Sequence, residues 1–271
     1  MMFRFLFAAL LVLPFSVSAA PLTIGETFTL ESEVLEETRR INVFVPTKWG
    51  EPIEQDLPVL YMPDGGMGED FLHIAGLLQV SVSNETMRPF MLVGIENTAR
   101  ERDLTGPTTD ERDLAMAPEV GGSENFRKFL RDELFPEIAS RYPVTDERAI
   151  IGESLAGLFV IDTLLHEPEM FDTWIAVDPS LWWNFNEFTK NAAKRLANIN
   201  GETLFIAAGK EAGSAEVFND FIEGLRQQDR SEFEWHYAHM PDETHATIYH
   251  PAAVRAVRTV FPPETGTATE Q

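Results

Sequence analysis

The sequence predicts an α/β fold in which a mostly parallel central sheet is covered by helices on both faces. Two observations lead to this prediction. Short apolar runs, typical of buried strands, alternate with segments whose apolar residues recur every three or four positions, as on one face of a helix. One such run, 149–151, leads through a turn of small residues into a helix-like segment at 158–165. Because the sequence shows no internal repeat and no linker, residues 20–263 are predicted to form a single domain.

The first 19 residues have the pattern of a secretory signal peptide. Arg4 provides the positive start, an apolar run extends from Phe5 to Phe15, and Val17-Ser18-Ala19 is a small-residue cleavage site. The apolar run is shorter than the roughly 20 residues that a membrane-spanning helix needs. We therefore expect cleavage near Ala19 and an exported protein, either periplasmic or secreted. Residues 264–271 are polar and are predicted to form a disordered tail.

Composition excludes several partners and chemistries. The formal net charge of −23 repels nucleic acid and anionic lipid, so we expect neither as a partner. After removal of the signal peptide, no remaining stretch is apolar enough to cross a membrane. The chain has no cysteine, which excludes disulfides, thiol nucleophiles and cysteine-based metal sites. The oligomeric state is left open.

The N-terminal part of the domain is predicted to be rich in strands. Two β-rich segments, 27–34 and 39–45, are separated by three residues and favour an antiparallel hairpin. Buried strands are predicted at 58–62 and 91–95, and the apolar spacing between them indicates a helix at 69–80.

The polar stretch 97–122 has no clear periodicity and is predicted to be a long loop, which in a compact domain is usually functional or mobile. Ser123 is predicted to cap the helix that follows, because apolar residues spaced by three and four continue from Phe126 to Ile138. The remaining strands are predicted at 149–151, 174–177, 204–208 and 233–237, and the remaining helices at 158–165, 217–225 and from just after His245 to about Val260.

The segment Gly152-Glu153-Ser154-Leu155-Ala156-Gly157 joins a predicted strand to a predicted helix, which is the context of a nucleophile elbow. Such a turn is so tight that only small side chains fit two positions before and two positions after the serine. Gly152 and Ala156 meet this requirement. We therefore predict that Ser154 is a nucleophile whose hydroxyl projects above the sheet edge. An ordinary Gly/Ser turn is the alternative unless the serine has catalytic partners.

A serine hydroxyl needs a base within hydrogen-bond reach, and in this architecture the base follows the serine in the chain. Of the six histidines, His245 alone falls in the loop between the last predicted strand and the closing helix, where the fold places its base. His239, just beyond the last strand, is the second choice. The others fall in predicted helices or inside a strand and are interpreted as surface or packing residues. His245 is therefore the predicted base.

A carboxylate is needed to orient the imidazole. Glu211 is the favoured candidate because it follows the strand that ends near Gly209, the usual position of the orienting acid. Asp178 closes the preceding strand and is an alternative that some hydrolases of this class use. A Ser–His dyad without a committed acid also remains open.

The oxyanion of the reaction needs two backbone N–H donors. Leu155 follows the nucleophile at the start of a helix and is one predicted donor, and Gly66 in the Asp64-Gly65-Gly66 turn is the other. Trp182 and Trp183 follow a strand end and are predicted to line a substrate pocket, although packing under a loop explains them equally well. The mechanism requires no metal and no organic cofactor.

These segments give the chain a likeness to a known family: it resembles the putative esterase family of α/β-hydrolases. That family includes enterochelin (catecholate siderophore) esterases and related periplasmic hydrolases, with esterase D and mycolyltransferases as more distant relatives. The resemblance covers nearly the whole mature chain and rests on Pro58–Gly65, Val93–Ile95, Arg100–Thr105, Phe129–Tyr142, Gly152–Leu158, Pro179–Trp183, Gly209–Glu211 and Glu243–His245. It implies an α/β-hydrolase fold, with Ser154, Glu211 and His245 as the reacting set and the amides of Gly66 and Leu155 as the oxyanion hole.

The sequence departs from the family at three positions. The family usually has Gly-His-Ser-x-Gly-Gly at the elbow, whereas here Glu153 replaces the histidine and Ala156 replaces a glycine. It also often has serine where Asp178 stands. None of these changes removes a catalytic group. We expect a carboxylate beside the nucleophile either to raise the pKa of the base or to shape the substrate preference.

The sequence thus predicts a serine carboxylic-ester hydrolase that works through an acyl-enzyme and acts on a small-molecule ester, with siderophore-type esters among the candidates. Two other functions use the same fold. One is a binding protein that has lost turnover, and the other is an acyltransferase that uses the same serine. The acyl and alcohol groups of the substrate are not predicted.

Overall fold

The computed structural model describes residues 19–263. The predicted signal peptide, apart from Ala19, and the predicted tail at 264–271 lie outside these residues. The strands are β1 (Glu26–Ser32), β2 (Glu37–Phe44), β3 (Leu57–Pro63), β4 (Met91–Ile95), β5 (Val144–Glu153), β6 (Thr173–Val177), β7 (Thr203–Ala208) and β8 (Glu234–His239). The helices are α1 (Phe71–Ser83), α2 (Arg100–Leu104), α3 (Glu111–Leu114), α4 (Ser123–Phe129), α5 (Phe135–Arg141), α6 (Leu155–His166), α7 (Trp183–Asn186), α8 (Ala192–Leu196), α9 (Lys210–Ser214), α10 (Glu216–Arg226) and α11 (Tyr249–Val260), with a π-helical turn η1 (Leu130–Leu134) between α4 and α5 and a 3-10 turn η2 (Pro168–Met170).

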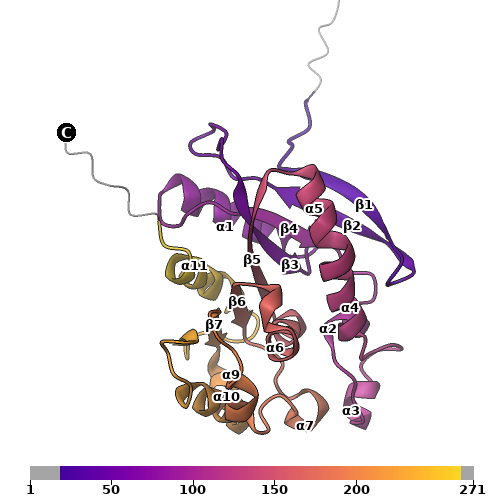
Figure 1. Ribbon diagram of the computed structural model, residues 1–271, viewed down its shortest axis with the longest axis vertical. Coiled ribbons are helices and arrows are strands. Elements are labelled where there is room, and N and C mark those ends of the chain that lie inside the picture. Colours follow the sequence, from indigo (N-terminus) through magenta and orange to yellow (C-terminus); the bar gives the residue numbers. More distant parts are fainter. Residues whose placement is uncertain (1–18, 264–271) are drawn as a thin grey trace, which may run out of the picture.

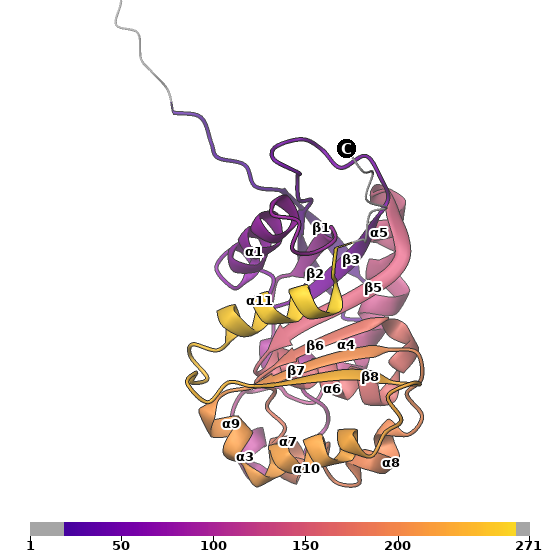
Figure 2. The same cartoon turned by 90° about the vertical axis from the view of Figure 1, so that its left-hand side faces the viewer.

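The eight strands form one sheet in the order β1-β2-β4-β3-β5-β6-β7-β8 (Figures 1 and 2). β1 and β2 form the predicted antiparallel hairpin, and β2 also pairs antiparallel with β4. From β4 to β8 every neighbouring pair is parallel. This topology is an α/β-hydrolase fold, as the sequence predicts. The carboxyl ends of β3 to β8 consequently meet at one edge, where the site of such a sheet lies.

Apolar side chains on both faces of the central strands explain why these strands appear in the sequence as continuous apolar runs. In β3, Val59 and Tyr61 belong to one core cluster, whereas Leu60 and Met62 belong to the other. Helices α1 and α11 contribute to the second cluster. Helices α4 to α6, α8 and α10 contribute to the first, so the sheet is covered on both faces (Figures 1 and 2).

The predicted loop at 97–122 is only partly irregular, because α2 and α3 lie within it. The prediction that Ser123 caps α4 is wrong. Ser123 is the first residue of that helix and the cap position is Gly122. The Ser123 hydroxyl instead donates a buried hydrogen bond of 2.6 Å to Asp162 in α6. Its polar side chain therefore joins two helices rather than satisfying a helix end.

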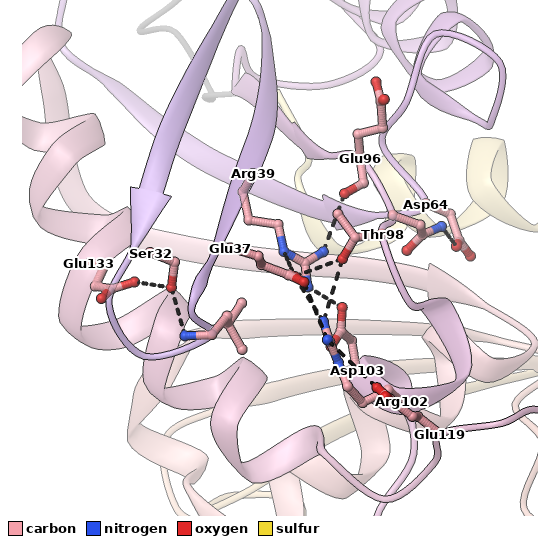
Figure 3. A network of polar contacts seen from close by, with 12 residues as sticks. Ser32, Glu37, Arg39, Asp64, Glu96, Thr98, Arg102, Asp103, Glu119 and Glu133 are labelled. Carbon is pink, nitrogen blue, oxygen red and sulfur yellow. Dashed lines mark hydrogen bonds and ion pairs between the residues drawn. The ribbon is translucent and has the colours of Figure 1, made fainter.

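A buried ion-pair network fixes α2 against the sheet (Figure 3). Arg39 on β2 is fully buried and pairs with both Asp103 of α2 and Glu37 of its own strand. Arg102 pairs with the same two carboxylates at 2.7 and 2.8 Å. Removing one partner of such a network would leave an uncompensated buried charge, which is strongly destabilising. The neighbouring Arg100 pairs with Asp64, which follows β3, at 2.7 Å.

None of the helices within residues 19–263 combines the length and the apolarity that crossing a bilayer requires.

Candidate active site

Ser154 occupies the strained turn that the sequence predicts between β5 and α6. Its backbone has φ 60° and ψ −119°, a region that non-glycine residues rarely adopt. A Cβ atom on Gly152 would lie 2.5 Å from the carbonyl group of Ala156, so the turn excludes any side chain there. The predicted elbow geometry is confirmed.

The neighbouring strand β6 holds the elbow in place through its backbone. The Ser154 N–H donates to the carbonyl oxygen of Val177 at 3.0 Å, and the Ser180 N–H donates to the carbonyl oxygen of Ser154 at 3.1 Å. These two bonds tie both sides of the nucleophile to the turn after β6. The serine is therefore positioned by the sheet itself rather than by a mobile loop.

His245 reaches the serine from the loop between β8 and α11, as predicted. Its Nε2 atom lies 3.1 Å from the Ser154 Oγ, although the two residues are 91 positions apart in the chain. The imidazole is half-exposed, with 53% of its side-chain surface accessible. This geometry is that of a base within hydrogen-bond reach of its nucleophile.

Asp178, not Glu211, holds the other side of the imidazole. Its Oδ2 lies 2.6 Å from His245 Nδ1, and its Oδ1 accepts a 2.7 Å hydrogen bond from the Gly209 N–H. Only 4% of the Asp178 side chain is exposed. Glu211 lies on α9 with an exposed side chain. The prediction that Glu211 orients the base is therefore wrong, and the alternative, Asp178, occupies that position.

The strand order explains this outcome. β6 is the immediate neighbour of β5, which leads into Ser154, whereas β7 is one strand further away. Asp178 follows β6 directly with φ 44°, a left-handed conformation that turns the chain at the strand end. The signal in the sequence that could have identified Asp178 is an aspartate placed immediately after an apolar strand.

The backbone N–H groups of the two predicted oxyanion donors differ in their hydrogen bonding. Leu155 begins α6, so its N–H lacks an intrahelical partner and lies beside the nucleophile at the positive end of the helix dipole. The Gly66 N–H instead donates a 2.6 Å hydrogen bond to Glu69 Oε2. Gly66 would have to exchange that carboxylate for an oxyanion before it could serve, so its role stays a prediction.

The two predicted pocket tryptophans have different environments. Trp183 is fully buried, and its indole N–H donates to the Gly106 carbonyl oxygen at 2.8 Å. The prediction that Trp183 contacts substrate is therefore wrong, and packing under the 97–122 segment accounts for it. Trp182 is 44% exposed and remains a candidate for a substrate contact.

Glu153 adds a second carboxylate at the base. Its Oε1 lies 3.4 Å from His245 Nε2, the same nitrogen that faces Ser154. Burial raises the pKa of Glu153 to about 7, and the charge on Asp178 adds to this rise while His245 opposes it. The hydrogen bond to Asp178 and the charge of Glu153 raise the pKa of His245 above its ordinary value of 6.5.

The other histidines lie apart from the serine. His239 ends β8 with an exposed side chain, and His73 and His250 contact each other between α1 and α11 at 2.8 Å. Among residues 19–263, no group of three or more histidine, aspartate or glutamate side chains is arranged to hold a metal ion. His245, and not the second choice His239, is therefore the histidine that faces Ser154.

Residues 32–250 match the family described as "Putative esterase". This match covers most of the chain. The chain belongs to the putative esterase family. Ser154, His245 and Asp178 all fall inside the matched range.

Several named proteins are similar in sequence. The chain is 33% identical over 168 residues to the ferri-bacillibactin esterase BesA of Bacillus subtilis, a match that covers 55% of this chain and 56% of the relative. It is 30% identical over 177 residues to the siderophore triacetylfusarinine C esterase of Aspergillus fumigatus, covering 60% and 58% of the two chains. The match thus spans a little over half the length of each relative.

Solved structures show the same fold. An IroE-like serine hydrolase from Shewanella oneidensis superposes with a TM-score of 0.78 at 24% identity, covering 88% of this chain and 80% of the other. The siderophore hydrolase EstB from Aspergillus nidulans gives a TM-score of 0.72 at 22% identity, covering 93% and 98%.

Proposed function

We propose that this protein of the putative esterase family is a serine carboxylic-ester hydrolase that works through an acyl-enzyme. The observation that carries the proposal is the continuous contact from Asp178 through His245 to Ser154, at 2.6 and 3.1 Å, with the serine on a strained elbow. A buried carboxylate, an imidazole and a serine in this order form a nucleophile with its base and its orienting acid.

In the proposed reaction, the Ser154 Oγ bonds to the acyl carbon while His245 Nε2 takes the hydroxyl proton. The carbonyl oxygen becomes an oxyanion beside the Leu155 N–H. Asp178 accepts a hydrogen bond from the Nδ1–H group of His245 and stabilises the imidazolium. Breakage of the ester C–O bond then releases the alcohol, which takes the proton from His245 and leaves an acylated serine.

A water molecule completes the cycle. His245 removes its proton as the water oxygen attacks the acyl carbon, and the Ser154 oxygen leaves with that proton. The products are a carboxylic acid and the free enzyme. Small esters are the proposed substrates, and siderophore-type esters are among them because similar proteins carry names that specify such esters.

Rapid mixing with 4-nitrophenyl butyrate tests this proposal. We expect a burst of 4-nitrophenol equal to the enzyme concentration whenever deacylation is the slower step, followed by steady release of butyrate. Addition of a primary alcohol separates hydrolysis from acyl transfer, since a transferase would form the butyrate ester in place of the acid. Release no faster than in buffer would favour a binding protein and contradict the proposal.

The pH dependence of kcat/KM follows from the raised pKa of His245. The imidazole accepts the serine proton only when it is neutral. We therefore expect kcat/KM to be low in acid and to rise with pH, with the midpoint of this rising limb above pH 6.5. Because His245 and Glu153 are 3.4 Å apart and titrate together, the limb belongs to the pair. Replacement of Glu153 by glutamine removes a negative charge and should move the limb to lower pH. A profile measured from pH 5 to 9 that stays unchanged in Glu153→Gln would contradict this coupling.

A further inference from the structure

The residue before the nucleophile stands at the reacting centre. The side chain of Glu153 is only 18% exposed, and its Oε1 faces His245 Nε2 at 3.4 Å. The same nitrogen lies 3.1 Å from the Ser154 hydroxyl. Any group that a substrate carries close to its ester therefore comes within reach of a carboxylate that is poorly screened by water.

The ionisable groups that face Glu153 leave this end of the sheet negative. They come from four other parts of the chain: Asp70 before α1, Arg100 in α2, Asp178 at the end of β6 and His245 before α11. Arg100 is already paired, since its Nε and one terminal nitrogen donate to the two oxygens of Asp64 at 2.7 and 2.8 Å. With His245 neutral, as a base must be, the carboxylates outnumber the cation.

A cavity beside Arg100 is also lined mainly by negative charge. Its volume is about 590 Å³, and Arg100 and neutral residues line it together with three carboxylates. These are Glu69, Glu101 and Glu119. Glu69 also borders the turn after β3, because it accepts the Gly66 N–H. An anionic group that enters here meets three negative side chains and a guanidinium that is already bound.

We infer that Glu153 selects substrates by charge, so that the Ser154 site takes neutral and cationic esters and discriminates against anionic ones. The inference rests on the proposed esterase function and names its substrate class. Three catecholates around Fe(III) leave a trianionic complex, whereas three hydroxamates leave a neutral one. Among iron-chelating esters, the site is therefore expected to prefer the tris-hydroxamate class over the tris-catecholate class.

Three thiobutyrate esters of similar size, whose thiol leaving groups are cationic, neutral and anionic, test the inference. The cationic ester is butyrylthiocholine, the neutral ester carries 3,3-dimethylbutanethiol, and the anionic ester carries 3-mercaptopropanesulfonate. The chain contains no cysteine, so a thiol reagent detects only the released product. The acyl group and the reacting atoms are common to all three. The ratios of kcat/KM therefore cancel any effect of a substitution on the chemistry itself.

In the wild type we expect kcat/KM to be highest for the cationic ester, lower for the neutral ester and lowest for the anionic ester. Glu153→Gln should lower the cation-to-anion ratio of kcat/KM by about tenfold, because it removes one poorly screened charge near the ester. Glu216→Gln, an exposed change at the start of α10, is the matched control and should leave the ratio unchanged. Glu153→His, which introduces the residue typical of the family, should also lower the cation-to-anion ratio, and it decides the question if Glu153→Gln is inactive.

The charge selection should depend on salt and on pH. Raised ionic strength should shrink the wild-type ratio more than that of Glu153→Gln, because the variant has one charge fewer beside the ester. Because the pKa of Glu153 is raised to about 7, the wild-type ratio should fall as the pH drops below that value and the carboxylate becomes neutral. If Glu153 does not act on the substrate, wild type and Glu153→Gln should show the same salt dependence, and the fall of the ratio below pH 7 should be absent.

The outcomes separate the two claims. A ratio that is the same in wild type, Glu153→Gln and Glu153→His would overturn the charge selection while leaving the esterase function intact. Hydrolysis of none of the three esters by the wild type would instead overturn the esterase function, and the inference with it. Equal kcat/KM for ferric tris-hydroxamate and ferric tris-catecholate esters would overturn the substrate class named here.

Discussion

Asp178→Asn is expected to lower kcat/KM for 4-nitrophenyl butyrate by roughly 10⁴-fold, because an amide in place of the carboxylate favours the wrong tautomer of His245. In the structure Asp178 Oδ2 accepts from His245 Nδ1, and the Gly209 N–H occupies Oδ1. An asparagine keeps the shape but loses the charge that stabilises the imidazolium. Most of the loss should appear in kcat, since Asp178 is buried and has no access to substrate.

Glu211→Gln is the matched comparison. It makes the same change of carboxylate to amide on an exposed side chain of α9, so kcat/KM should stay within about twofold of the wild type. Circular dichroism and the melting temperature of both variants show whether each is folded. If Glu211→Gln lost activity and Asp178→Asn kept it, the assignment of the acid would be reversed.

Ser154→Ala is expected to remove roughly 10⁶-fold of kcat, because the nucleophile that forms the acyl-enzyme is gone. His245 and Asp178 remain in place, so the variant should still bind esters. The alanine fits the elbow, which accepts small side chains, although the φ of 60° remains strained for it. Steady-state hydrolysis of 4-nitrophenyl butyrate by freshly purified protein measures the loss.

Ser154→Ala combined with Asp178→Asn sharpens this prediction. Residues of a triad act as a unit, so the double variant should be no slower than Ser154→Ala alone. A loss that multiplied across the two changes would indicate that Asp178 acts in a reaction that does not pass through Ser154. Hydrolysis by Ser154→Ala at the wild-type rate would remove the serine from the mechanism.

The sequence was sufficient to predict the features that depend on local patterns. The alternation of buried strands with amphipathic helices predicted the sheet, and β5, the elbow and α6 appear where the Gly-Glu-Ser-Leu-Ala-Gly segment placed them. His245 was predictable because its loop connects the last strand to the last helix. These features follow from periodicity and turn chemistry, which single segments of a chain encode.

The errors concern contacts between segments that are far apart in the chain. The choice between Asp178 and Glu211 depends on which strand end lies beside β5, and that is a property of the assembled sheet. The burial of Trp183 depends on the 97–122 segment folding over it, through the carbonyl group of Gly106. Sequence periodicity contains none of this information.

Covalent labelling tests the central claim, that Ser154 is a nucleophile activated by His245 and Asp178. Wild-type protein is treated with a fluorophosphonate probe, digested and analysed by mass spectrometry to locate the adduct. We expect one adduct, on Ser154, which forms much more slowly in Asp178→Asn than in Glu211→Gln and is absent from Ser154→Ala. An adduct on any other residue, or fully active protein that the probe leaves unlabelled at Ser154, would contradict the account.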